Sequence, residues 1–213
     1  IADGDFTWAF QTTVPQLVSQ NPIDVIDADN RRIQAQFSTA IDEALLSAET
    51  VRISREGEAL TPTDIRFSEE NTLSFELDGG LKPGSRYEVA LDGRLAGPLR
   101  VIADGDFTWA FQTTIPQLVS QNPTDVIDAD NRRIQAEFST AIDEALLSAE
   151  TVRISREGET LTPTDIRFSE ENTLSFELDG GLKPGSRYEV ALDGRLAGPL
   201  RVIADGDFTW AFQ

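Results

Sequence analysis

The chain has 213 residues with no histidine and no cysteine, and its formal net charge at pH 7 is −19. A strongly acidic chain repels nucleic-acid phosphates and anionic membrane surfaces, and the lack of histidine and cysteine removes most nucleophilic and zinc-dependent mechanisms. We therefore expect no nucleic-acid partner, no membrane insertion and no enzymatic activity.

The sequence repeats with a period of 101 residues. The segment IADGDFTWAFQ occurs at residues 1–11, 102–112 and 203–213. Residues 12–112 and 113–213 differ at four aligned positions, which are Val14/Ile115, Ile23/Thr124, Gln36/Glu137 and Ala59/Thr160. Because each unit has ordinary domain size, we expect one domain at 12–112 and a second at 113–213. Residues 1–11 are then the last strand of a preceding or neighbouring repeat.

Each unit contains short segments in which apolar and polar residues alternate. Such a period of two, with one polar face, is typical of antiparallel strands that are buried on one side. The expected strands of the first unit, in chain order, are Gln16–Ser19, Arg32–Phe37, Thr50–Ser54, Asp64–Ser68, Thr72–Leu77, Arg86–Leu91 and Phe107–Phe111. About seven such strands, separated by turn residues, predict an all-β fold: tandem immunoglobulin-like β-sandwiches. The proline of the connecting segment Thr113–Pro116 predicts a stiff joint and an elongated molecule.

Residues 38–46 are an exception to the β pattern. They combine helix-forming residues with apolar side chains at Ile41, Leu45 and Leu46. We expect one short helical turn here, which caps one end of the sandwich. The alternative is an amphipathic helix that binds a partner, although a helix this short needs the core behind it to be stable.

Four sequence motifs in the unit point to a known family. They are I-x-A-x-F-S-x-A-I-D at Ile33–Asp42, N-T-L-S-F-E-L at Asn71–Leu77, L-K-P-G-S-R-Y-E-V at Leu81–Val89 and F-T-W-A-F-Q-T at Phe107–Thr113. In these motifs the unit resembles the bacterial Ig-like domains of surface-layer and other cell-surface proteins. Leu81–Gly84 followed by Tyr87 also resembles the tyrosine corner, in which the phenol bonds to upstream backbone. The connection Gly93–Pro98 departs from the Gly-Asn turn that many members carry, so no loop-borne activity is transferred.

The resemblance implies an extracellular location at the bacterial cell surface. We expect a non-catalytic structural repeat of a long extracellular fibre, surface layer or stalk. Its partners would be other copies of the same repeat, in the same chain or in neighbouring chains. The alternative is an adhesin module that binds a host or carbohydrate ligand, and a third reading is an accessory domain beside a catalytic one.

Acidic side chains crowd two turns of the unit. Asp27 and Asp29 follow the first expected strand, and Asp205 and Asp207 precede the last strand of the second unit. In an Ig-type sandwich these turns face the neighbouring domains, and Ca²⁺ prefers carboxylate oxygens. The sequence therefore suggests an inter-repeat calcium site at these four residues. In a second arrangement, Glu170 and Glu171 would take the place of Asp205 and Asp207. Solvated acidic turns are the alternative, and no other cofactor is expected.

The aromatic strand of each unit is the remaining candidate binding surface. Phe107, Trp109 and Phe111 fall on one face of the strand, where they either fill the core or form a platform for sugars; the alternation favours the core. The copy at residues 1–11 carries Phe6, Trp8 and Phe10. Because burial of one large aromatic ring contributes about 2–3 kcal/mol, we expect these three to be buried against a sandwich made by other residues. That sandwich is either a preceding domain or a neighbouring molecule.

Overall fold

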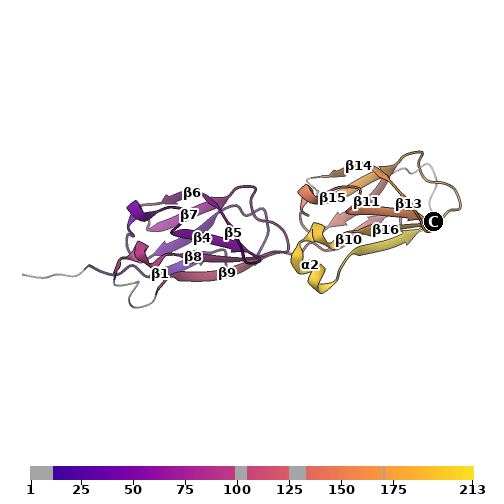
Figure 1. Cartoon of the computed structure of the whole chain (residues 1–213). Helices are drawn as coiled ribbons and strands as arrows, with labels where there is room; N and C mark the ends of the chain where they lie inside the picture. Colours follow the sequence, from indigo (N-terminus) through magenta and orange to yellow (C-terminus); the bar gives the residue numbers. More distant parts are fainter. Residues whose placement is uncertain (1–11, 99–104, 125–132, 170) are drawn as a thin grey trace, which may run out of the picture.

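The computed structural model describes residues 12–98, 105–124, 133–169 and 171–213. They form two β-sandwiches that follow one another end to end (Figure 1). We call them repeat 1 and repeat 2. The predicted fold class, all-β with tandem Ig-like sandwiches, is confirmed.

Repeat 1 is built from two sheets. The first has the order β1-β3-β7-β6 and the second the order β2-β9-β8-β4-β5. The strands of the first sheet are β1 (Leu17–Asn21), β3 (Ile33–Phe37), β6 (Pro62–Phe67) and β7 (Thr72–Leu77). Those of the second are β2 (Asp24–Ile26), β4 (Val51–Arg55), β5 (Glu58–Leu60), β8 (Arg86–Leu91) and β9 (Phe107–Thr113). Neighbouring strands are antiparallel except β2 and β9, which run parallel.

Repeat 2 reproduces this topology. Its sheets have the orders β10-β11-β15-β14 and β13-β12-β16-β17. The strands of the first sheet are β10 (Leu118–Asn122), β11 (Arg133–Phe138), β14 (Pro163–Phe168) and β15 (Thr173–Leu178). Those of the second are β12 (Val152–Arg156), β13 (Glu159–Leu161), β16 (Tyr188–Leu192) and β17 (Phe208–Phe212). The residues that correspond to β2 fall in 125–132, outside the described part of the chain.

Short helical segments lie in the connections. The helical turn expected within residues 38–46 is a 3₁₀ turn, η1 (Glu43–Leu45), repeated as η3 (Glu144–Leu146). Two further 3₁₀ turns, η2 (Gly93–Ala96) and η4 (Gly194–Ala197), were not expected from the sequence. In repeat 2 a short α-helix, α2 (Pro199–Ala204), follows η4 and has proline in its first turn, where a missing N–H does no harm.

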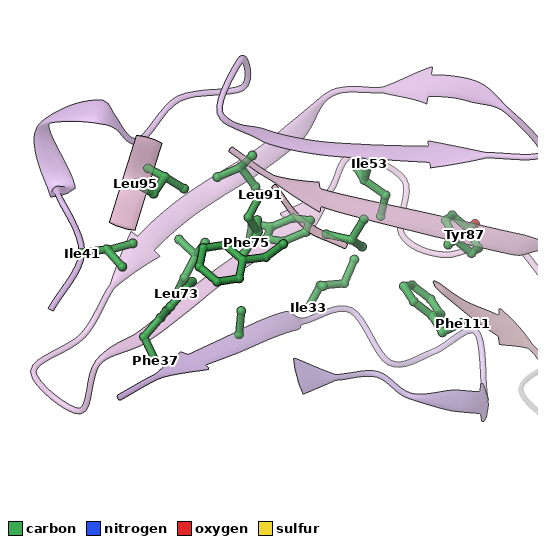
Figure 2. Close-up of a cluster of buried hydrophobic side chains, with 14 of the residues drawn as sticks. Ile33, Phe37, Ile41, Ile53, Leu73, Phe75, Tyr87, Leu91, Leu95 and Phe111 are labelled. Carbon is green, nitrogen blue, oxygen red and sulfur yellow. The ribbon is translucent and has the colours of Figure 1, made fainter. Parts of the chain in front are cut away.

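The core lies between the two sheets of each repeat. In β7 every second residue is buried, as the alternation predicts. The ring of Phe37 meets that of Phe107 edge-on at 5.3 Å, and Tyr87 stacks on Phe111 at 5.1 Å. Figure 2 shows the labelled core residues Ile33, Phe37, Ile41, Ile53, Leu73, Phe75, Tyr87, Leu91, Leu95 and Phe111. The core therefore draws on both sheets and on the connections at η1 and η2.

Candidate functional site: the joint between the two repeats

The loop of residues 81–85 forms one side of the joint. The backbone N–H of Lys82 donates a hydrogen bond to the phenol oxygen of Tyr87 at 2.7 Å, which is the bond expected of a tyrosine corner. The hydroxyl of Thr113 donates to the carbonyl of Lys82 at 2.6 Å and accepts from the N–H of Ser85 at 2.9 Å. Burial raises the pKa of Tyr87, so its phenol remains neutral. The loop is thus fixed between β8 and the end of β9.

The other side of the joint is the end of repeat 2 that carries η3, η4 and α2. The backbone N–H of Asp143 donates to the carbonyl of Leu196 at 2.8 Å, which ties η3 to η4. Asp193 caps η4, accepting from the N–H of Arg195 at 2.9 Å, and also pairs with the Arg195 guanidinium. That side-chain bond holds the pKa of Asp193 below its ordinary value. Gly198, with φ of 92°, is the N-cap of α2, which begins at Pro199.

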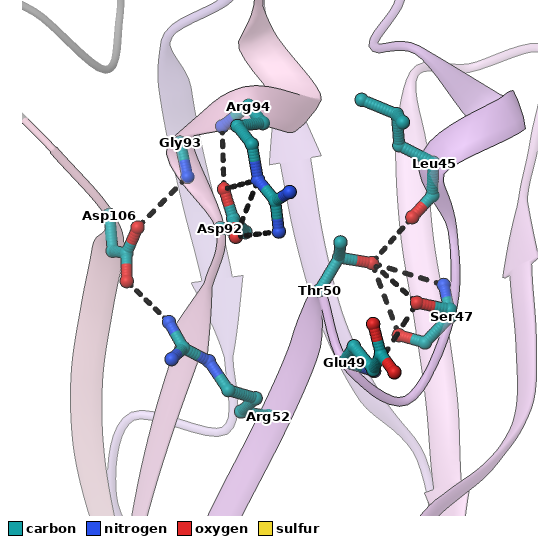
Figure 3. A network of polar contacts seen from close by, with 9 residues as sticks. All are labelled: Leu45, Ser47, Glu49, Thr50, Arg52, Asp92, Gly93, Arg94 and Asp106. Atoms are coloured by element: carbon teal, nitrogen blue, oxygen red, sulfur yellow. Dashed lines mark hydrogen bonds and ion pairs between the residues drawn. The ribbon is translucent and has the colours of Figure 1, made fainter.

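Repeat 1 carries the same polar framework around its η2 turn (Figure 3). Asp92 accepts from the N–H of Arg94 at 2.8 Å and pairs with its guanidinium. Asp106 accepts from the N–H of Gly93 at 3.0 Å and pairs with Arg52. The loop below η1 is closed by the hydroxyl of Thr50, which donates to the carbonyl of Leu45 at 2.6 Å. These contacts fix η1 and η2 relative to the sheets.

The two sides meet in a close contact between the repeats. The ammonium of Lys82 lies 2.9 Å from a carboxylate oxygen of Asp143, and these side chains are 33% and 16% exposed. The N–H of Leu200, in α2, donates to the carbonyl of Gly84 at 3.0 Å. The two repeats are therefore joined by a charge-assisted hydrogen bond and a backbone hydrogen bond as well as by the chain itself.

Two glycines allow the backbones to come this close. A Cβ added to Gly84 would lie 2.1 Å from the carbonyl oxygen of Ala197, and one added to Gly198 would lie 2.0 Å from that of Pro83. Real Cβ atoms essentially never come within 3.0 Å of another heavy atom, so no other residue fits at either position without opening the joint. Both glycines also have positive φ, of 52° and 92°.

The structure does not gather the residues suggested as calcium ligands. Asp27 accepts a hydrogen bond from the Thr114 hydroxyl at 2.9 Å, in the segment that leads to repeat 2, and Asp29 is exposed. In repeat 2, Asp205 pairs with Arg201 at 2.8 Å, and Asp207 pairs with Arg153 and accepts from the N–H of Gly194. Of the alternative pair, Glu171 is exposed and Glu170 lies outside the described residues.

Calcium binding therefore remains a prediction of the sequence. Over the described ranges, no group of three or more acidic side chains is placed so that it could hold a metal ion. Asp205 and Asp207 each already face an arginine, and a cation would have to displace it. Calcium titration with Asp27→Asn as the comparison tests this expectation.

The aromatic strands are part of the core. Phe107 and Phe111 in β9 are buried, as are Phe208 and Phe212 in β17. Trp109 is partly buried and packs against the same cluster. The phenylalanine rings are therefore not available as a platform for sugars, whereas Trp109 is also one of the residues that line a hollow at the surface. The corresponding Phe6, Trp8 and Phe10 fall within residues 1–11, outside the described residues, and their burial remains a prediction.

The outer face of the second sheet forms a shallow hollow in both repeats. In repeat 1 small side chains such as Ser54, Ala90 and Ala110 form its floor, and Arg52 and Glu88 lie among them. The hollow of repeat 2 is smaller and is lined by the counterparts of most of these residues, with Thr160 in the position of Ala59. The described residues that line it do not specify a ligand.

The fold and the joint define a tandem Ig-like protein whose successive domains are held end to end. The chain belongs to the bacterial Ig-like domain family, whose model matches residues 11–113 and again residues 112–213. Comparison with curated protein sequences finds no significant match. No helix in the described ranges has the length and hydrophobicity needed to cross a lipid bilayer.

Similar solved structures are distant. The N-terminal part of the bacterial S-layer protein SbsC is 15% identical, with a TM-score of 0.35 over 94% of this chain and 44% of that one. The L,D-transpeptidase LdtMt1 in complex with imipenem is 14% identical, with a TM-score of 0.35 over 93% and 74%. The Ig1-2 module of the Drosophila receptor protein tyrosine phosphatase DLAR is 10% identical, with a TM-score of 0.29 over 94% and 97%. The chain thus spans less than half of the S-layer structure, and these likenesses carry no conclusion about function.

Proposed function

We propose that this chain is part of a non-catalytic structural array on the outside of a bacterial cell, in which Ig-like repeats are joined end to end. The observation that carries this proposal is the joint itself. Two domains on a flexible tether need no matched glycines, yet Gly84 and Gly198 allow a backbone contact that no larger residue permits. A fixed joint converts a row of domains into a stiff spacer.

Family membership and charge support the same function. Bacterial Ig-like repeats suit a stalk, fibre or surface layer, in which length and stiffness are useful properties. A net charge of −19 keeps such an extended surface soluble and discourages side-by-side association. Two nearly identical repeats also suit an array in which each domain meets the next in the same way.

Electron microscopy of the native material tests this function. An array of these repeats should appear as rods or ordered filaments on the cell exterior, with a spacing of about one domain along the axis. Small-angle scattering of the chain should show an extended particle of fixed length. A globular surface protein without such a periodicity, or a scattering profile of two domains packed side by side, would contradict the proposal.

The adhesin function is the second candidate, and the hollow on the outer sheet face is the observation that favours it. An adhesin would bind a glycan or a host protein there while remaining monomeric. A glycan array gives the direct test, with Ala90→Arg as the variant that fills the hollow. Specific binding that this variant abolishes would favour the adhesin over the structural array.

A further inference from the structure

Repeat 2 carries, at its far end, an unused copy of the surface with which repeat 1 holds repeat 2. Lys183 and Gly185 correspond to Lys82 and Gly84 at the 101-residue period. Gly84 is buried in the joint, whereas Gly185 is exposed, and a Cβ on Gly185 would meet no atom of the described part of the chain within 4 Å. Lys183 is likewise exposed, while Lys82 is half-buried.

Repeat 1 carries an unused copy of the opposite surface. Asp42 and Gly97 correspond to Asp143 and Gly198. Asp42 is exposed where Asp143 is half-buried, and among the described residues a Cβ on Gly97 would meet nothing within 4 Å. The segment that corresponds to Leu200 lies outside the described residues.

The unused surfaces keep part of the conformation of the occupied ones. The N–H of Lys183 donates to the phenol of Tyr188 at 2.7 Å, the same distance as between Lys82 and Tyr87. On the opposite surface, Gly97 has φ of 89° and ψ of 169°, against 92° and 169° at Gly198. The tyrosine bond of Lys183 and the backbone of Gly97 therefore form without a partner. The rest of the Lys183 loop differs from its counterpart: the N–H of Ser186 donates to the carbonyl of Lys183 at 3.4 Å, whereas that of Ser85 donates to the Thr113 hydroxyl. This loop would adjust when a copy of the domain binds.

We propose that the two free ends bind a further copy of this domain through the same contact. Lys183 of one chain would pair with Asp42 of the next, and Gly185 and Gly97 would take the places of Gly84 and Gly198. The two surfaces differ and lie at opposite ends of the molecule, so the contact is heterologous and extends an open row instead of closing a dimer. The proposal deepens the proposed structural function and rests on it, since it names the partner as a second copy of this chain.

Charge sets the conditions for this association. Two chains of net charge −19 repel each other, whereas the contact itself pairs an ammonium with a carboxylate. Salt at about 0.15 M shortens the screening length to about 8 Å. It therefore weakens the long-range repulsion between the chains more than the ion pair, whose side chains are partly buried. End-to-end association should therefore be observed at high protein concentration and moderate salt.

Zero-length cross-linking with a carbodiimide tests the proposal, because this reagent joins an amine to a carboxylate only where they touch. The chain has two lysines, Lys82 and Lys183. In the variant Lys82→Arg, Lys183 carries the single side-chain amine. Trypsin then releases Ile33–Arg52 and Ile134–Arg153, which differ only by Gln36 in place of Glu137. Mass spectrometry can therefore tell a link to Asp42 from a link to Asp143.

The expected result is a ladder of linked chains in which Lys183 is joined to Asp42. Adding Gly185→Ala should reduce this product at least tenfold, because its Cβ would collide with the incoming chain as it would at Gly84. Gly158→Ala is the matched control, because Gly158 also has positive φ, of 84°. Its equivalent in repeat 1, Gly57, lies away from the joint: a Cβ added there would meet no described residue of repeat 2 within 4 Å. Circular dichroism should show all variants folded.

Other outcomes overturn the proposal. A chain that stays monomeric at high concentration, or links from Lys183 scattered over other acidic residues, would show that the free ends do not bind another copy. A ladder that is unaffected by Gly185→Ala would show that the chains associate through another surface. In the wild-type chain, which keeps Lys82, a cross-link between Lys82 and Asp143 would still confirm the joint between repeat 1 and repeat 2. Electron microscopy of the native array would then decide the proposed function separately.

Discussion

Gly84 of repeat 1 and Gly198 of repeat 2 face each other across the joint so closely that a Cβ on Gly198 would lie 2.8 Å from the Cα of Gly84. Their counterparts Gly185 and Gly97 also have positive φ, of 69° and 89°, and a Cβ on either would meet no other described residue within 4 Å. The chain thus contains each glycine in an occupied and in a free form. A comparison of substitutions at Gly84 and Gly185 therefore separates backbone strain from contact across the joint.

The first prediction concerns Gly84→Ala and Gly185→Ala. Each places a Cβ at positive φ and should destabilise its own repeat by about 1–2 kcal/mol. Only Gly84→Ala also forces the repeats apart, because its Cβ would overlap the carbonyl of Ala197. Small-angle scattering should therefore show a wider range of inter-repeat angles for Gly84→Ala and the wild-type profile for Gly185→Ala. Identical profiles for both variants would contradict the joint described here.

The second prediction concerns the ion pair between Lys82 and Asp143. Lys82→Met removes the charge and keeps much of the apolar stem, so the closed joint should lose about 0.5–1 kcal/mol. The chain has no cysteine, so two engineered cysteines, one on each repeat, can carry dyes for single-molecule energy transfer. The population of open molecules should rise in Lys82→Met and not in Lys183→Met. Raising the salt concentration should reduce the difference between Lys82→Met and wild type; a difference that is insensitive to salt would argue against an electrostatic contact.

The strand pattern could be predicted from the sequence where alternation is strong. Thr72–Leu77 and Arg86–Leu91 were expected as strands and are β7 and β8, with the same bounds. The short strands β2 and β5 were missed, because three residues are too few to show a period of two. The turn at Glu56–Gly57 was recognised, but it closes a hairpin whose second strand, β5, has no alternation of its own.

The joint could not be predicted in the same way. Lys82 and Gly84 were recognised only as part of a tyrosine-corner motif, since nothing local distinguishes them from Lys183 and Gly185 in an identical sequence. Their role follows from the placement of repeat 2, which brings Asp143 and Gly198 against them. For the acidic turns, the sequence suggested a site that the structure does not assemble. Their composition suggested a cation, yet Asp205 pairs with Arg201, four residues before it, and Asp207 pairs with Arg153, which is distant in the sequence.

The third prediction concerns Thr113, whose side chain is buried where β9 ends. Its hydroxyl bonds to the carbonyl of Lys82 and to the N–H of Ser85, and the residue is 1% exposed. Thr113→Val keeps the shape but leaves both backbone groups without this partner, at a cost of about 1–3 kcal/mol. Denaturant unfolding should show this loss, whereas Thr12→Val, at the exposed equivalent position, should change the free energy of unfolding by less than about 0.5 kcal/mol. Equal effects at the two positions would show that the hydroxyl does not hold the loop.

The fourth prediction concerns pH and the two aspartates that cap η2 and η4. The Arg94 side chain, bonded to Asp92, holds the pKa of that carboxyl below its ordinary value of 3.8, and Arg195 does the same for Asp193. The pKa of each carboxyl is lower in the folded state than in the unfolded state. These groups therefore stabilise the fold above about pH 4, where they are ionised in the folded and the unfolded state alike. This contribution is lost as the pH falls through the folded pKa.

The double variant Asp92→Asn/Asp193→Asn keeps an oxygen that can cap each turn and removes the charge. Its thermal unfolding midpoint should therefore lie below that of the wild type at pH 7, and the difference should shrink steadily below pH 4. Other carboxylates titrate in the same range, but they are common to both proteins and cancel in the difference. Adding Arg94→Gln and Arg195→Gln to the double variant should produce little further change, since the arginines would already have lost their partners. Equal midpoints for variant and wild type at pH 7, or a difference that stays constant from pH 7 to pH 2, would show that the charge of these aspartates does not stabilise the fold.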